Sequence, residues 1–304
     1  MNLRLVSGNS VEDSGLLSTD WTIPVNSYGT KLFFNYLHGN YAVGQDLADL
    51  GMKGRTQIYG GSISHPFLKK KNMNFSANFD YKYKYNKNVI LGQTRSIDEL
   101  NMYTVALNFD NLDRFLGKNI FSLAYSWGQL EPDLKLSTSR IPVDETFDKY
   151  NLNYARIQKI YGYTNIMLRA GAQYSDKRLV PIEQAGLGGY GSVRGYDPSL
   201  YLGDSGFNLS AEVMFAPPYL AEKTFFGQRL AQLVQFAVFY DYGGVFVTDA
   251  DSTESTEFLT GYGAGIRLFY KNWFTFKYDM GFPKEGKEGK PNRFEYFQFS
   301  FNMF

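Results

Sequence analysis

The sequence predicts an all-β protein, specifically a transmembrane antiparallel β-barrel with about 14 strands visible in 304 residues. Two observations predict this class. The chain is rich in aromatic residues, with 26 Phe and 24 Tyr. Apolar and polar residues also alternate over unusually long segments, and successive residues of a strand point to opposite faces. A tilted strand needs ~9–11 residues to cross a bilayer, and several of these segments are that long.

The clearest alternation runs from Met73 to Tyr85. Aromatic residues and one Ala occupy the odd positions from 75 to 85, whereas Asn, Ser, Asp and Lys occupy the even positions. The last segment repeats the pattern, with Phe at 297, 299 and 301 and Met303 on the apolar face. A soluble β-sandwich also alternates, but its strands are usually shorter and its inner face is aliphatic. The long aromatic faces therefore favour a membrane barrel whose apolar face meets outer-membrane lipid.

The same alternation and its breaks give fourteen expected strands. They lie near residues 2–7, 15–25, 30–40, 56–66, 73–85, 102–110, 119–127, 149–158, 163–174, 207–216, 232–242, 258–270, 273–281 and 294–303. The whole of 1–304 is interpreted as a single barrel domain. Strand phase predicts that Val238 and Tyr240 face lipid while Phe239 and Asp241 face inward.

The connections between these strands alternate in length. Those expected on one side are mostly short (26–29, 67–72 and 271–272), with 217–231 as the long exception. Those on the other side are expected to be long (41–55, 86–101, 128–148 and 175–206). Short periplasmic turns and long outer loops are typical of outer-membrane barrels, so the C-terminus is predicted to be periplasmic. The chain ends on Phe304, out of phase with 297–303, and segment 294–304 is the expected contact with the barrel assembly machinery.

Composition excludes several other classes. The net charge of +1 and the lack of long charged blocks argue against nucleic-acid binding, and the absence of Cys excludes disulfides and Cys-based metal sites. His38 and His65 are interpreted as wall or rim residues, and no Gly-x-Ser-x-Gly motif occurs. We therefore expect no enzyme activity, no cofactor and no metal. The first residues do not read as a signal peptide.

The stretch GGYGSVRGY at 188–196 lies in the longest expected loop, 175–206. Its glycines allow tight turns, and Arg194 would need carboxylate partners if the loop folds inward. Strand phase places Glu212 and Asp241 on inward faces, where they could hold the two sides of one guanidinium group. On spacing alone, the three residues could equally be unconnected.

Several motifs resemble the two-partner secretion transporters of the haemolysin secretion/activation family. They are the VRGY sequence (Val193, Arg194, Gly195, Tyr196), the Gly-Asp-x-Gly step (Gly203, Asp204, Gly206), Glu212, and the Phe-x-Asp-x-Gly motif (Phe239, Asp241, Gly243). Earlier stretches, including NSYGTKLFFNYLHGNYAVG, are similar too, so the resemblance covers nearly the whole chain.

This resemblance implies a 16-stranded barrel in the bacterial outer membrane whose sixth outer loop folds into the lumen, with its arginine held by wall acids. It also implies export of an extended haemolysin-like or adhesin-like exoprotein without ATP, after two periplasmic receptor modules recognise it. Residues 2–7 would then be the third strand. We expect the first two strands, the receptor (POTRA) modules and the signal peptide to lie outside this chain.

Three alternatives differ from the export channel in kind. A passive diffusion porin shares the polar alternation, but it does not explain the VRGY loop and its two inward acids. A truncated barrel fragment would be non-functional because it lacks the first two strands and the receptor modules. A membrane-embedded hydrolase would need a nucleophile, a His and an acid together, and the sequence offers no such motif.

Overall fold

The computed structural model describes residues 2–7, 15–42, 53–131, 138–217, 219, 221–225, 227–250, 254–271, 273–285 and 292–301. Fourteen strands form the main sheet, and each follows its neighbour in chain order. The first seven are β1 (Asn2–Ser7), β2 (Gly15–Pro24), β3 (Lys31–Ala42), β4 (Lys53–Lys70), β5 (Met73–Ile90), β6 (Gln93–Leu112) and β7 (Lys118–Glu131). The others are β8 (Thr146–Tyr161), β9 (Thr164–Tyr174), β12 (Ser205–Phe215), β15 (Val234–Phe246), β16 (Glu257–Tyr270), β17 (Phe274–Pro283) and β18 (Phe294–Phe301).

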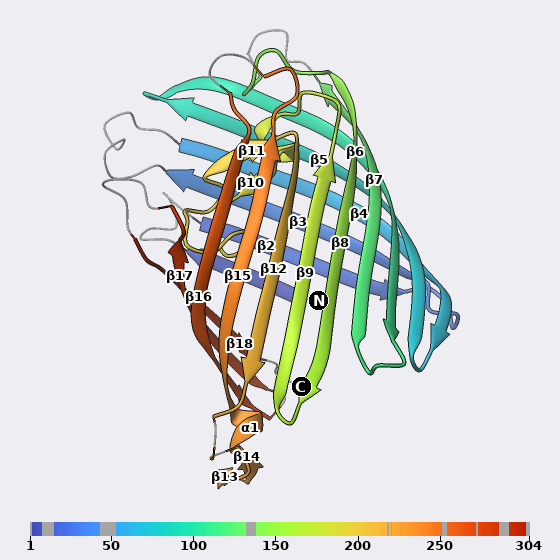
Figure 1. Cartoon of the computed structure of the whole chain (residues 1–304). Helices are drawn as coiled ribbons and strands as arrows, with labels where there is room; N and C mark the ends of the chain where they lie inside the picture. Colours follow the sequence, from blue (N-terminus) through green and yellow to red (C-terminus); the bar gives the residue numbers. More distant parts are fainter. Residues whose placement is uncertain are drawn as a thin grey trace. The chain divides into compact units, whose positions relative to one another are not determined.

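The remaining elements are short and lie in two connections. Between β9 and β12 the chain forms the 3-10 helix η2 (Pro181–Glu183) and a small hairpin of β10 (Ala185–Leu187) and β11 (Tyr201–Gly203). Between β12 and β15 it forms β13 (Thr224–Phe225), β14 (Gln228–Arg229) and α1 (Leu230–Leu233) (Figure 1). Within the described ranges, no helix is long and apolar enough to cross a membrane.

The all-β prediction and its fourteen strands are confirmed. Consecutive long strands run in opposite directions, and every pair whose register is known is antiparallel (Figure 1). In the main sheet, all strands but β1 and β18 have 10 to 20 residues, which is longer than the strands of a typical soluble sandwich. The chain divides into two compact units. One is Met1–Phe109, Ser122–Asn151 and Tyr174–Gln184, and the other is Asp110–Phe121, Leu152–Gln173 and Ala185–Phe304.

Side-chain exposure follows the predicted phase. In β15, Val238 and Tyr240 are about half exposed, whereas Phe239 and Asp241 are buried. In β18, Phe297, Phe299 and Phe301 are each about 60% exposed. So large a set of exposed aromatic residues is unusual for a soluble protein and is typical of the lipid-facing surface of a barrel.

The prediction of a long loop at 86–101 is wrong. Strand β5 continues to Ile90 and β6 begins at Gln93, so a two-residue turn joins them. Leu91 and Gly92 both have positive φ, as the tight turns of β-hairpins require. The alternation fades here because residues 86–101 mix polar and apolar side chains on both faces, with Arg95 and Ile97 on one face and Asp98 and Leu100 on the other, although the backbone pairing continues. Sequence hydropathy therefore marks the apolar part of these strands rather than their full length.

Other connections differ less from expectation. The predicted loop at 128–148 is shorter, because β7 extends to Glu131 and β8 starts at Thr146. Strand β4 likewise extends through Lys69 and Lys70, which were expected in a turn. Most of the predicted loop 41–55, and Phe304 with the end of segment 294–304, lie outside the described residues.

Candidate functional site

Arg194 lies at the tip of the loop between β9 and β12, and its side chain is only 1% exposed. Its guanidinium group makes a two-point contact with Asp241 on β15. Nε donates to Oδ2 at 2.7 Å and an Nη atom donates to Oδ1 at 3.0 Å. The Arg194 backbone N–H also donates to Asp241 Oδ2, at 3.1 Å. This paired geometry is the strongest that arginine makes with a carboxylate, and it fixes both the side chain and the backbone of the tip.

The other side of the guanidinium group meets three further residues. Nη1 lies 3.0 Å from Glu212 Oε2 on β12 and 3.5 Å from Asp279 Oδ2 on β17. Nη2, the atom that donates to Asp241 Oδ1, also lies 3.3 Å from Ser210 Oγ. The structure therefore brings Arg194, Glu212 and Asp241 together. All these contacts lie within the second compact unit.

A second arginine completes the network. An Nη atom of Arg267 on β16 lies 2.8 Å from Glu212 Oε1 and 2.7 Å from Asp279 Oδ1. Two cations thus share three carboxylates, and all five groups are at most 3% exposed. We call these five groups, together with two residues that contact Arg194, the arginine cluster. Its members are Arg194, Ser210, Glu212, Phe239, Asp241, Arg267 and Asp279. Removing one charged member would leave buried opposite charges unpaired.

Phe239 explains the aromatic position of the Phe-x-Asp-x-Gly motif. The Cζ atom of Arg194 lies 3.3 Å from the centre of the Phe239 ring, so the guanidinium group stacks on its face. Burial alone would lower the pKa of Arg194, but hydrogen bonds and charges from Asp241, with the charges of Glu212 and Asp279, outweigh it and raise that pKa. Arg194 is therefore a permanent cation.

The backbone of the tip is also fixed. Gly195 has φ +99°, a conformation that side chains rarely adopt, and its N–H donates to the hydroxyl group of Tyr296 on β18 at 3.0 Å. The same hydroxyl donates to the carbonyl of Tyr196 at 3.2 Å. The hydroxyl of Tyr196 in turn donates to the carbonyl of Thr260 at 2.9 Å. The tip therefore contacts β15, β16 and β18 through separate groups.

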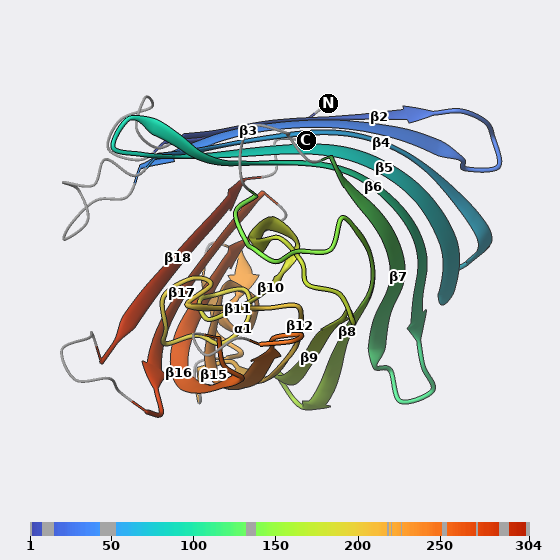
Figure 2. The same cartoon turned by 90° about the horizontal axis from the view of Figure 1, so that it is seen from above.

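An apolar cluster lies beside these polar contacts. Val193 and Tyr196 from the loop pack with Leu187, Val245 and Leu259, all buried. In Figure 2, β10 and β11 lie on the concave side of the wall that β12, β15 and β16 form, and β10 and β11 both contact β15. The VRGY sequence thus supplies one apolar residue, one cation, one glycine and one tyrosine to a single docked tip.

Glycines in the wall make room for the tip. A methyl group on Gly261 would overlap the carbonyl oxygen of Arg194, and one on Gly281 would lie 2.7 Å from the Gly195 nitrogen. A methyl group on Gly243, the last residue of the Phe-x-Asp-x-Gly motif, would lie 2.7 Å from the Phe207 carbonyl oxygen on the neighbouring strand, 2.8 Å from the side chain of Leu187 and 3.3 Å from that of Val193. Close backbone approach is therefore the reason that this motif ends on glycine.

We expect Gly261→Ala to displace the tip while the sheet still forms, because overpacking costs about 1–3 kcal/mol and the loop is the part able to move. Trypsin cleavage after Arg194, identified by mass spectrometry of the folded protein, should accelerate. Gly191→Ala is the matched control, since a methyl group there has nothing within 4 Å. Equal cleavage in both variants would contradict a close-packed tip.

The Gly-Asp-x-Gly step holds the second end of the loop. Asp204 is fully buried; its Oδ2 accepts the Thr248 N–H at 2.9 Å, and its carbonyl accepts Gln173 Nε2 at 3.1 Å. Gly203 and Gly206 pass close to β15. A methyl group on Gly203 would lie 2.8 Å from the Phe246 carbonyl oxygen, and one on Gly206 would lie 3.0 Å from the Gly244 carbonyl oxygen. These residues join the loop to β12 and β15 rather than forming part of the arginine cluster.

Sequence reasoning missed four residues of this site, namely Ser210 as a ligand of the guanidinium group, Arg267, Asp279 and Tyr296. The signal for two of them was present. Arg267 lies between the apolar residues Ile266 and Leu268, and Asp279 between Tyr278 and Met280, so strand phase alone turns both inward. The role of Tyr296 carried no such signal, because its hydroxyl meets backbone atoms about 100 residues away.

The histidines have simple wall partners. His65 Nδ1 lies 2.8 Å from Thr30 Oγ1, and His38 Nδ1 lies 3.3 Å from Gln57 Nε2. Among the described residues, no group of three or more His, Cys, Asp or Glu side chains could hold a metal ion. The arginine cluster consists of ion pairs, an aromatic face and a Ser210 hydroxyl that accepts from Arg194, so its geometry suits holding a loop.

Comparisons with known proteins identify the family and the fold of the chain. The model of the haemolysin secretion/activation protein ShlB/FhaC/HecB family matches residues 4–268. The chain belongs to this family. A curated relative is the heme/hemopexin transporter protein HuxB of Haemophilus influenzae, 24% identical over 282 residues, covering 88% of this chain and 47% of HuxB. The chain thus spans about half the length of the curated relatives it matches.

Solved structures show the same fold. CdiB from Escherichia coli superposes with a TM-score of 0.78 at 18% identity, over 95% of this chain and 53% of that one. BamA from Haemophilus ducreyi, in a form lacking POTRA domains 1–3, gives a TM-score of 0.63 at 14% identity, over 95% and 62%. This ShlB/FhaC/HecB-family chain is therefore a β-barrel protein of the bacterial outer membrane.

Proposed function

We propose that this chain is the membrane-spanning part of a two-partner secretion channel, which exports a haemolysin-like or adhesin-like protein in extended form. The arginine cluster is the observation that supports this most. It holds the tip of a long loop against the inward face by buried ion pairs, in a chain whose family is named for haemolysin secretion/activation. A simple diffusion channel needs no such device.

The inward face suits an extended polypeptide. Its strands carry short polar side chains such as Asn74 and Asn78, which can exchange hydrogen bonds with a passing backbone. In this proposal no ATP is used, because folding of the exported chain outside the cell can supply the free energy. The loop held by Arg194 supports the resting channel and limits leakage. The proposal gives no catalytic role to any of the described residues, and β18 contacts the barrel assembly machinery.

The test uses the full-length gene product in its own cells. Deleting the gene should remove one large protein from the culture medium, as measured by quantitative mass spectrometry, and a plasmid copy should restore it. Purified full-length protein in planar bilayers should show brief, rare openings rather than steady large ones. An unchanged medium together with steady conductance would contradict export and indicate a diffusion porin.

A further inference from the structure

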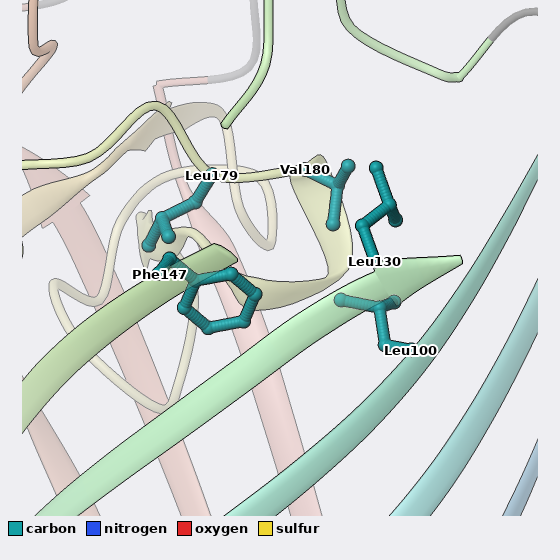
Figure 3. Close-up of a cluster of buried hydrophobic side chains, with 5 residues drawn as sticks. All are labelled: Leu100, Leu130, Phe147, Leu179 and Val180. Carbon is teal, nitrogen blue, oxygen red and sulfur yellow. The ribbon is translucent and has the colours of Figure 1, made fainter. Parts of the chain in front are cut away.

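The loop between β9 and β12 has a second attachment, far in sequence from its tip. Its first arm, residues 175–184, belongs to the first compact unit, whereas the arginine cluster belongs to the second. Leu179 and Val180 are at most 1% exposed and pack against Leu100 on β6, Leu130 on β7 and Phe147 on β8 (Figure 3). The arm therefore buries apolar side chains on inward faces of strands that take no part in the arginine cluster.

Polar contacts from the segment before β8 hold the same arm. Arg178 N–H donates to Asp144 Oδ2 at 2.7 Å, and Asp144 N–H donates back to the Arg178 carbonyl at 3.1 Å. Arg140 donates to the carbonyl of Leu179 at 2.9 Å. Ser139, beside Arg140, is itself fixed by the buried carboxylate of Asp98 on β6. The arm is thus enclosed between the wall and residues 138–145.

Glu183, at the end of η2, provides the charged contact of this arm. Its carboxylate is 1% exposed and lies 2.5 Å from Lys84 Nζ on β5 and 2.9 Å from Lys149 Nζ on β8. Lys149 Nζ also donates to the Glu183 carbonyl at 2.9 Å. Strands β6 and β7 separate β5 from β8 in the sheet order, so one carboxylate joins two distant strands.

The charge balance makes Glu183 central to this contact. Two ammonium groups share one carboxylate, so the set carries an excess positive charge, and loss of the carboxylate would leave two buried cations facing each other. Burial alone would raise the pKa of Glu183, but the charges and hydrogen bonds of Lys84 and Lys149 outweigh it and lower that pKa. The carboxylate therefore stays ionised at neutral pH.

We propose that Glu183 is a positioning residue, which anchors the first arm of the loop to Lys84 and Lys149 independently of Arg194. The two anchors share no residue in any contact described above. Loss of Arg194 loosens the tip while the arm stays docked. Loss of Glu183 loosens the arm, which then has only its apolar and backbone contacts, while the tip stays docked. Only the consequence for export rests on the proposed function; the docking itself does not.

The chain contains no Cys, so single cysteine reporters can follow each anchor separately. Val180→Cys reports on the arm and Val193→Cys on the tip, and both positions are at most 1% exposed. In the purified full-length protein, Glu183→Gln should raise the maleimide labelling rate of the arm reporter about tenfold or more, since local opening sets the rate at a buried site. The tip reporter should stay at its wild-type rate, and Arg194→Gln should give the reverse pattern.

Two controls keep the result specific. Glu131→Gln makes the same chemical change at an exposed position in the same unit, and neither reporter should respond. Lys84→Gln leaves Glu183 paired with Lys149, so it should raise arm labelling less than Glu183→Gln does. If the Glu183→Gln protein fails to assemble, Lys84→Gln takes its place in the test. Unchanged arm labelling in both variants would overturn the anchor. A rise at both reporters in every variant would overturn independence.

Labelling is measured without any exported partner, so this test stands apart from the export test. A protein that exports nothing can still show two independent anchors, and that result would separate the two proposals. If export does occur, Glu183→Gln should change it without abolishing the tip contacts, as the tip reporter would show.

Discussion

Arg194→Ala in the full-length protein should reduce export of the partner at least tenfold while the barrel still reaches the outer membrane. Breaking a buried ion pair by removing one partner costs about 3–5 kcal/mol, and here it strips Asp241 of its two-point contact and leaves Glu212 and Asp279 with Arg267 alone. The apolar contacts of Val193 and Tyr196 should not restore the tip. The measurement is the amount of partner in the medium, normalised to folded channel in outer-membrane fractions.

Two variants sharpen this result. Arg194→Lys keeps the charge but cannot make a two-point contact, so export should also fall. Arg293→Ala removes a guanidinium group that is 59% exposed and paired with Glu295, and it should have no effect. Full export by Arg194→Ala would show that the tip needs no arginine. Loss of folded channel instead would assign the arginine cluster to assembly rather than transport.

The strands could be predicted because one physical rule fixes them. A strand with lipid on one face and a polar interior on the other must alternate, and the residues from 75 to 85 display this without exception apart from a small Ala. The rule stops where each face mixes polar and apolar residues, so it predicts a long loop where the hairpin at Leu91–Gly92 lies. Backbone pairing continues there without a hydropathy signal.

The site was predictable only in part. Strand phase turned Glu212 and Asp241 inward, and the VRGY resemblance indicated that Arg194 would meet them. The same phase argument, applied to β16 and β17, would have added Arg267 and Asp279. Glu183 could not be found in this way, because it lies in a loop without periodicity and its partner Lys84 is 99 residues away. Contacts between a loop and distant strands depend on the three-dimensional path of the loop.

Phe79→Lys should destabilise the folded barrel by about 2–4 kcal/mol, the cost of a lysine on the lipid face near the bilayer midplane. Phe79 is 47% exposed, and it lies opposite Ile63 on β4, which is also exposed, so a charge there would face hydrocarbon rather than a partner. The control is Asn78→Lys, one residue earlier. Asn78 pairs with Ser64 on the opposite, polar face, and a lysine there can reach water.

Gln298 is a poorer control position because it accepts a hydrogen bond from Tyr190. The measurement is urea unfolding of the protein in lipid vesicles, followed by the fluorescence of its three Trp residues. A lower midpoint for Phe79→Lys and an unchanged one for Asn78→Lys would agree with the strand phase. Equal shifts would contradict it, because one residue along a strand exchanges lipid for the interior.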